Sequence, residues 1–106
     1  MTQAESEEGG PPPALPEGLS RELMIVNRKG LHARATAKFV QCVDRFDADV
    51  KVSRSGETVG GDSIMGILTL GAGPGSTITV TTSGAEAREA LEALADLISN
   101  RFGEDA

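Results

Sequence analysis

The chain has 106 residues, of which 39% are hydrophobic, and a formal net charge of −6. This length suffices for one domain, and the lack of any run of about 18 apolar residues excludes a transmembrane helix. With three phenylalanines and neither tyrosine nor tryptophan, the sequence lacks the aromatic platforms on which single-stranded nucleic acids stack, and its acidic balance also disfavours a nucleic-acid partner.

Residues 1–18 differ in composition from the rest of the chain. They contain four of the five prolines, four glutamates and neither lysine nor arginine. Such a segment buries too little apolar surface to offset its ordering entropy, so we expect a disordered acidic tail. It also lacks the basic and apolar regions of a signal peptide. Residues 19–106 form the predicted domain.

The first half of this domain is predicted to contain a strand, a helix and a hairpin. Residues 21–26, RELMIV, favour a short strand. A helix is expected over residues 32–46 because apolar side chains recur at intervals of three and four. Alternating residues around Val50 and Val52, followed by a turn at 55–56, predict a two-stranded hairpin. The recurring helical positions are Ala35, Phe39, Val43 and Phe46.

The second half is predicted to contain a short helix, a strand and a longer helix. The short helix covers residues 63–70, and the β-branched run at 77–82 favours a strand. Ser83 and Glu86 have the spacing of a capping box for the last helix, and Gly103 stands where a helix commonly ends. The expected apolar stripe of that helix is Leu91, Leu94, Ala95, Ile98 and Phe102.

The resulting order of elements is β-α-β-β-α-β-α. Because the connections are short, the strands are expected to form one antiparallel sheet with the helices on one face. The predicted fold class is therefore α+β, a two-layer open-faced sandwich in which three helices cover one face of a four-stranded antiparallel sheet.

The segment GLHARA, residues 30–35, contains the only histidine. His32 lies at the expected start of a helix, where free N–H groups attract anions, in a basic stretch without acidic residues between Glu22 and Asp44. A neutral imidazole is a nucleophile that needs no general base, and Arg34 offers a planar fork to phosphate oxygens. These features indicate a phosphoryl-accepting site, and a solvated helix cap is the alternative interpretation.

The stretch GLHARATAKFV resembles the active-site segment of the HPr family, the histidine-containing phosphocarriers of the phosphoenolpyruvate-dependent phosphotransferase system. A second stretch, DSIMGILTLGAGPGSTITV, resembles the regulatory-serine helix, glycine-rich loop and fourth strand of that family. The resemblance extends over about residues 20–103. It implies that phosphorylated enzyme I phosphorylates His32 on Nδ1, that Arg34 contacts the phosphoryl group, and that a histidine of an EIIA protein receives it. Ala35 replaces the proline usual in the family.

The resemblance also assigns a second phosphorylation site and a docking surface. It implies that Ser63 is the regulatory serine, a substrate for an HPr kinase/phosphorylase. From the sequence alone a helix N-cap is the favoured interpretation, a role that Asp62 could also fill; with the family pattern, capping and regulation are compatible. An exposed apolar patch on the short helix would dock on enzyme I and EIIA, although core packing explains the same residues. The patch residues are Ile64, Met65 and Leu68.

Basic residues around the patch are expected to raise association rates with acidic partners; they are Arg28, Lys38 and Arg54. The loop GAGPGS is interpreted as a turn, since it lacks both the strand-loop-helix order and the lysine of a P-loop. With one histidine and one distant cysteine, Cys42, the sequence predicts neither a metal site nor a cofactor. The single cysteine is typical of a reducing cytosol, so we expect a cytoplasmic protein.

The sequence therefore predicts a monomeric phosphocarrier that is a stoichiometric intermediate rather than an enzyme. The alternative is a regulatory module of the same fold, in which the phosphorylation state of His32 and Ser63 only controls binding to target proteins. The sequence leaves open whether the sugar or the nitrogen branch of the system is served, because the end RFGEDA is typical of the nitrogen-related version and SIMG of the sugar version.

Overall fold

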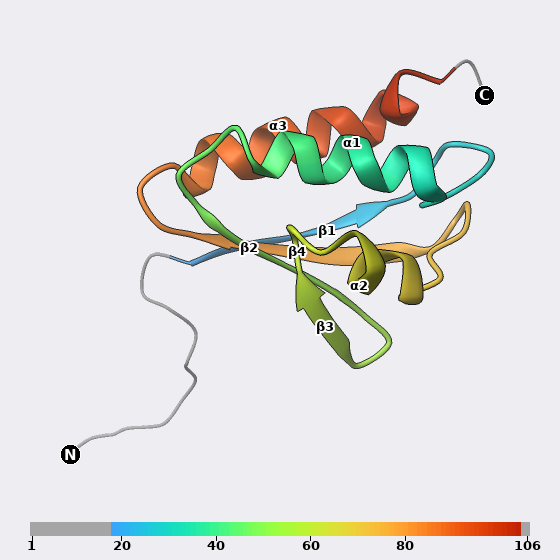
Figure 1. The fold of residues 1–106 in the computed structure, drawn as a ribbon, viewed down its shortest axis with the longest axis horizontal. Coiled ribbons are helices and arrows are strands. Elements are labelled where there is room, and N and C mark those ends of the chain that lie inside the picture. The colour runs from blue at the N-terminus through green and yellow to red at the C-terminus, as the bar shows by residue number, and fades with distance from the viewer. Residues whose placement is uncertain (1–17, 105–106) are drawn as a thin grey trace.

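The computed structural model describes residues 18–104, so the predicted tail, apart from Gly18, lies outside the described residues. The predicted order of elements and the open-faced sandwich are confirmed (Figure 1). In chain order the elements are β1 (Leu19–Met24), α1 (Ala33–Val43), β2 (Asp49–Arg54), β3 (Glu57–Gly60), α2 (Ile64–Thr69), β4 (Thr77–Ser83), α3 (Ala87–Ser99) and the 3-10 turn η1 (Arg101–Gly103).

The four strands form one antiparallel sheet in the order β1-β4-β2-β3. Side chains of β4 alternate between the two faces: Ile78 and Val80 are buried, whereas Thr77 is exposed. Such alternation is expected of an antiparallel sheet with one covered face. The long helices α1 and α3 lie side by side over that face, and α2 lies beside α1 near β3 (Figure 1). Among residues 18–104 no helix could span a bilayer, the longest having 13 residues.

The hydrophobic core lies between the sheet and the helical layer. Its largest fully buried side chain on α1 is Phe39, and α2 contributes Ile67. The predicted helical positions Ala35, Phe39 and Val43 are buried, and Phe46 packs partly buried against them. Because α1 and α2 share this core, the fold fixes the position of one helix relative to the other.

Two element boundaries differ from the sequence prediction. The first strand lies two residues earlier than expected, since Leu19 to Met24 pair with Thr82 to Thr77. Ile25 lies just beyond β1 and is buried; its backbone N–H donates to the carbonyl of Ser76, and its carbonyl accepts from the N–H of Gly75, each at 2.8 Å. The helix α1 ends at Val43 rather than near Phe46, because backbone bonds from Arg45 to Cys42 and from Phe46 to Val43 close a tight turn there.

The predicted capping box of the last helix is wrong. Ser83 is the final residue of β4, opposite Asp49, and Glu86 at the N-cap makes no side-chain hydrogen bond to the helix. Instead, Oε1 of Glu86 accepts a hydrogen bond of 2.7 Å from the backbone N–H of Asp47. The glutamate thus ties the start of α3 to the loop between α1 and β2.

The end of the chain also differs from the prediction. The stripe on α3 is buried as expected except for Ala95, which is half-buried. The helix ends at Ser99, before the predicted stop at Gly103, and the chain continues into η1. There Arg101 and Phe102 adopt left-handed φ values of 57° and 55°, and Phe102 is 1% exposed. Burial of the phenylalanine fixes this turn, and with it the direction of the residues that follow.

Candidate functional site

His32 is the N-cap of α1, as the sequence predicts. Its carbonyl accepts the first helical hydrogen bond, from the N–H of Thr36 at 2.9 Å. Its ring nitrogen Nδ1 accepts a hydrogen bond of 3.3 Å from the backbone N–H of Arg34. The side chain is 27% exposed, so the ring lies at the surface with Nδ1 facing the free N–H groups of the helix start.

The loop before His32 rests on the glycine-rich loop that precedes β4. Gly30 has a left-handed φ of 67°, and the neighbouring Leu31 N–H donates to the carbonyl of Ala72 at 2.9 Å. A Cβ atom on Gly30 would lie 2.7 Å from both Ala72 O and the Cα of Gly73. The predicted turn GAGPGS therefore has a structural role, because its backbone supports the loop that presents the histidine.

Glu104 is the acidic neighbour of His32, and sequence reasoning missed it. Its Oε2 lies 2.6 Å from Nε2 of the ring, and its side chain is 18% exposed. The sequence between Glu22 and Asp44 has no acidic residue, but the fold brings the side-chain carboxylate of Glu104 to His32 from the other end of the domain. Hydrogen bonds from Asn27 and from His32 lower the pKa of the Glu104 carboxyl.

Asn27 holds the other oxygen of this carboxylate. The side chain is completely buried, and its Nδ2 donates to Oε1 of Glu104 at 3.0 Å and to the carbonyl of Gly30 at 2.9 Å. One amide group thus links the C-terminal segment to the loop before His32. Because 77 residues separate Asn27 from Glu104, no local sequence pattern indicates this contact.

The basic residues proposed around the site differ in their surroundings. Arg28 and Arg34 are exposed, and within residues 18–104 neither guanidinium has an ion-pair or hydrogen-bond partner. By contrast, Nζ of Lys38 donates to the carbonyl of Phe102 at 2.6 Å. Arg54 donates to the carbonyl of Leu70 at 2.8 Å and so holds the end of α2. Of these four basic residues, Arg28 and Arg34 are thus the two whose guanidinium groups are not engaged by another residue within 18–104.

Ser63 is the N-cap of α2, so the cap interpretation is confirmed. Its Oγ accepts a hydrogen bond of 3.0 Å from the N–H of Gly66, and Asp62 does not fill this role. The absence of a side chain at Gly66 matters, since a Cβ there would lie 2.9 Å from Oγ of Ser63 and 3.0 Å from Cβ of Val59. Phosphorylation of the half-buried Ser63 stays a prediction.

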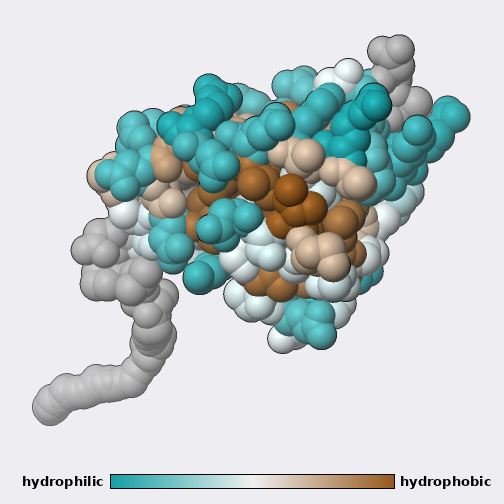
Figure 2. Space-filling view, in the orientation of Figure 1, coloured by the Kyte–Doolittle hydropathy of each residue, from teal (hydrophilic) through white to brown (hydrophobic). Residues whose placement is uncertain are grey.

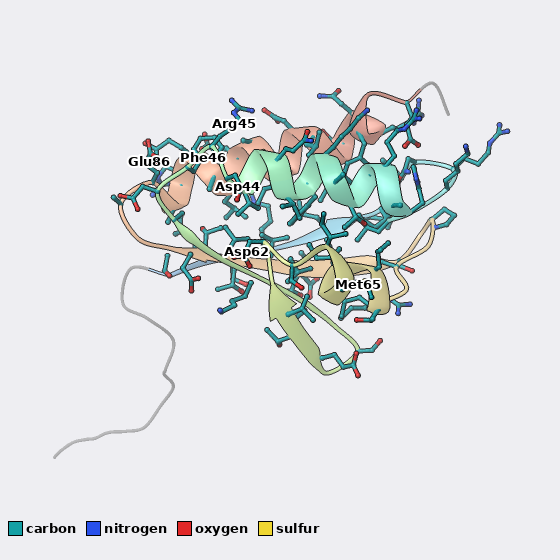
Figure 3. All side chains as sticks on the ribbon, viewed as in Figure 1. Asp44, Arg45, Phe46, Asp62, Met65 and Glu86 are labelled. Carbon is teal, nitrogen blue, oxygen red and sulfur yellow. The ribbon has the colours of Figure 1, made fainter. Side chains whose placement is uncertain are left out.

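The helix α2 presents an apolar surface to solvent. Met65 is 72% exposed and Ile64 is 43% exposed, whereas Leu68 is half-buried and Ile67 lies in the core. Figure 2 shows apolar residues gathered where α2 adjoins α1, and Figure 3 shows Met65 on the outer side of α2. Figure 3 also places Asp44, Arg45, Phe46 and Glu86 at the far end of the helical layer, away from the N-terminus of α1. We call Ile64 and Met65 the α2 apolar surface.

No group of three or more histidine, cysteine, aspartate or glutamate side chains in the described part of the chain could hold a metal ion. Cys42 is buried, and this burial raises the pKa of its thiol. The chemistry that the site offers is therefore that of the imidazole, of the N–H groups at the start of α1 and of the exposed guanidinium groups.

The family described as PTS HPr component phosphorylation site matches residues 19–100. Phosphocarrier protein HPr of Cupriavidus necator is 51% identical over 86 residues, which make up 81% of this chain and 97% of that protein. A crystal structure of HPr from Thermoanaerobacter tengcongensis is similar with a TM-score of 0.80 at 38% identity, covering 83% of this chain and 99% of that one. HPr from Bacillus anthracis gives a TM-score of 0.74 at 46% identity, covering 76% and 96%.

Proposed function

This chain belongs to the HPr family of phosphocarrier proteins, and from that membership we propose that His32 accepts a phosphoryl group from phosphorylated enzyme I and passes it to a histidine of an EIIA protein. The protein acts as a stoichiometric carrier of the phosphoryl group rather than as an enzyme with its own catalytic turnover. In this proposal it is a cytoplasmic monomer.

The arrangement of the two ring nitrogens is the observation that carries the proposal. Nδ1 of His32 faces the N–H of Arg34 at 3.3 Å, and Nε2 faces the carboxylate of Glu104 at 2.6 Å. A group that accepts phosphorus needs an available electron pair next to donors that stabilise the incoming oxygens. Nδ1 meets both conditions, since it is unprotonated and lies at the N-terminus of α1 beside the N–H of Arg34.

Arg34 and Arg28 supply the positive charge that the phosphoryl group requires. Both side chains are exposed, so either can move toward a dianion when a partner brings it. A guanidinium can bind two phosphate oxygens at once. We propose that Arg34, two residues after His32, contacts the transferred group, and that Arg28 and Lys38 favour approach of acidic partners.

The α2 apolar surface is the proposed docking site for both partners. Exposed apolar side chains beside a polar rim are typical of protein interaction sites, and the flexible side chain of Met65 suits more than one partner. The helix also contacts α1, whose first turn carries His32. A partner seated on Ile64 and Met65, and on the half-buried Leu68, would therefore lie near the imidazole.

A two-stage transfer experiment tests the proposed carrier function. With phosphoenolpyruvate and catalytic enzyme I, the full chain is expected to take up one acid-labile, alkali-stable phosphoryl group per molecule. Addition of an EIIA protein should then remove the label from the chain and place it on EIIA. If the label forms but no EIIA from either the sugar or the nitrogen branch removes it, the protein is a regulatory module instead of a carrier.

Substitutions at Ser63 separate charge from helix capping. Aspartate and asparagine both accept a hydrogen bond at an N-cap, so Ser63→Asp and Ser63→Asn are each expected to keep α2 formed. Only Ser63→Asp adds negative charge beside the α2 apolar surface, as a phosphoserine would. We expect slower phosphorylation of Ser63→Asp by enzyme I, by about 10-fold, which corresponds to a loss of roughly 1.4 kcal/mol.

The initial rate of labelling at limiting protein concentration measures this effect. Ser63→Asn is the matched control and should be labelled at the rate of the parent, with an unchanged thermal transition. Equal rates for both variants would show that charge at Ser63 does not regulate transfer from enzyme I.

A further inference from the structure

We propose that Glu104, held by Asn27, is a positioning residue that keeps the proton of the His32 ring on Nε2 and so leaves the electron pair of Nδ1 free for phosphorus. The inference rests on the proposed carrier function and adds to it a residue near the end of the chain. Its basis is the linked set of contacts among His32, Glu104 and Asn27.

The two contacts of the ring select the same tautomer. A carboxylate has no proton to donate, so the 2.6 Å contact between Oε2 of Glu104 and Nε2 requires the ring proton on Nε2. A backbone N–H cannot accept, so the contact from Arg34 requires an unprotonated Nδ1. The nitrogen that carries the proton is set by the partner of the other nitrogen, and here both partners agree.

Asn27 holds the Glu104 carboxylate in the position from which it contacts the His32 ring. Both acceptors of the buried amide, Oε1 of Glu104 and the carbonyl of Gly30, lie within 3.0 Å of the atom assigned as Nδ2. Only an NH2 group can donate to both, so the amide has one possible orientation. Its Oδ1 has no hydrogen-bond partner among the described residues, so the two donations from Nδ2 are the side-chain hydrogen bonds that hold the amide within residues 18–104.

The C-terminal turn brings Glu104 to this position. Phe102 is buried in the core, and its carbonyl accepts a hydrogen bond of 2.6 Å from Nζ of Lys38 on α1. The backbone N–H of Glu104 donates to the carbonyl of Arg101 at 2.9 Å. The carboxylate is therefore presented by an ordered turn that is attached to the same helix as His32.

The fixed tautomer removes any proton movement from the transfer step. The electron pair of Nδ1 forms the new bond to phosphorus while the bond between phosphorus and the donor atom of enzyme I breaks. The two electrons of the broken bond stay with the donor atom. The His32 ring then has a substituent on Nδ1, a proton on Nε2 and a positive charge, which the adjacent carboxylate stabilises. Onward transfer breaks the same bond and returns the pair to Nδ1.

The Glu104→Gln variant tests this role because its amide has an oxygen at one end only. The Nδ2 donor of Asn27 requires that oxygen, so the NH2 group of the new amide faces Nε2 of His32. The contact with Nε2 is shorter than the one with Arg34, 2.6 Å against 3.3 Å, so we expect it to decide the tautomer and to move the proton to Nδ1. Glu104→Ala should give a smaller shift in the same direction.

Two measurements follow, and the first needs no partner protein. Long-range proton–nitrogen NMR spectra of histidine-labelled protein at alkaline pH report which ring nitrogen carries the proton. The parent is expected to carry the proton on Nε2, and Glu104→Gln mainly on Nδ1. In the second measurement, kcat of enzyme I with the variant as acceptor should fall by about 10- to 100-fold at unchanged KM.

Glu92→Gln is the matched control, since it makes the same chemical change at an exposed position of α3. The inference is overturned if Glu104→Gln keeps the proton on Nε2, if it changes the tautomer without slowing transfer, or if only KM changes, which would indicate a docking role. A parent that is not phosphorylated on His32 would instead overturn the carrier function, while the tautomer measurement would still report on the contact itself.

Discussion

His32→Asn is expected to lose all phosphoryl acceptance from enzyme I while the protein stays folded. Asparagine retains a side-chain acceptor for the N–H of Arg34 and is a preferred N-cap residue, so α1 should keep its start. It has no nucleophilic nitrogen, so the covalent intermediate cannot form. Labelling with phosphoenolpyruvate and enzyme I, followed by an acid-stability test, should give no signal above background.

His32→Ala provides the comparison for the structural contribution. It removes both the nucleophile and the cap, so we expect the same loss of label together with a decrease of about 1 kcal/mol in the free energy of unfolding. His32→Asn should show the first effect with little of the second. If either variant is labelled as well as the parent, the phosphoryl group resides on another residue.

Gly30→Ala is expected to destabilise the fold by about 2–4 kcal/mol, because left-handed backbone strain adds to overpacking. The φ of Gly30 is 67°, and the added Cβ would lie 2.7 Å from Ala72 O and from the Cα of Gly73. Both of these atoms belong to backbone, which cannot rotate away as a flexible side chain does. Denaturant unfolding of the parent and the variant measures the difference.

Gly71→Ala is the matched control for this prediction. Gly71 has a nearly equal φ of 65°, but a Cβ there would have no atom within 4 Å. It should therefore cost only the backbone strain, about 1 kcal/mol. Equal losses for the two variants would show that the close approach of Gly30 to the glycine-rich loop does not support the site. A larger loss for Gly30→Ala, with slower phosphorylation, is the expected result.

The order of elements follows from local patterns in the sequence. The hydrophobic periodicity of an element reflects which of its residues face the core, and it can be read without a structure. Apolar residues alternate in β2 and β4, and they recur at helical spacing in α1 and α3. Boundaries are less visible, because they depend on pairing partners. The strand β1 ends at Met24, where its register with Thr77 ends, although apolar residues continue along the chain.

The predicted capping box shows a second limit of local patterns. Ser83 and Glu86 have the right residue types and spacing, yet β4 extends through Ser83 and the glutamate bonds to Asp47 instead. A helix N-cap competes with other uses of the same side chains, and the outcome depends on what the fold brings near. Ser63, for which Asp62 was the alternative cap, did become the cap of α2.

The candidate site could be predicted only in part. His32 and Arg34 are close in sequence and carry their own chemistry, so residue type and spacing suffice to suggest them. Glu104 lies 72 residues from His32, and Asn27 looks like an ordinary polar turn residue before Gly30. Their contact depends on how η1 folds back over α1, which is a consequence of the burial of Phe102 and has no signature in the sequence.

The position of phosphorus on the imidazole is the most direct test of the account. The parent protein, labelled with 15N in histidine and phosphorylated by enzyme I, can be examined by NMR for coupling between phosphorus and each ring nitrogen. The unprotonated Nδ1, which accepts only from the N–H of Arg34, and the contact of Nε2 with Glu104 predict coupling to Nδ1 alone. Coupling to Nε2, or phosphorus bound outside the ring of His32, would contradict it.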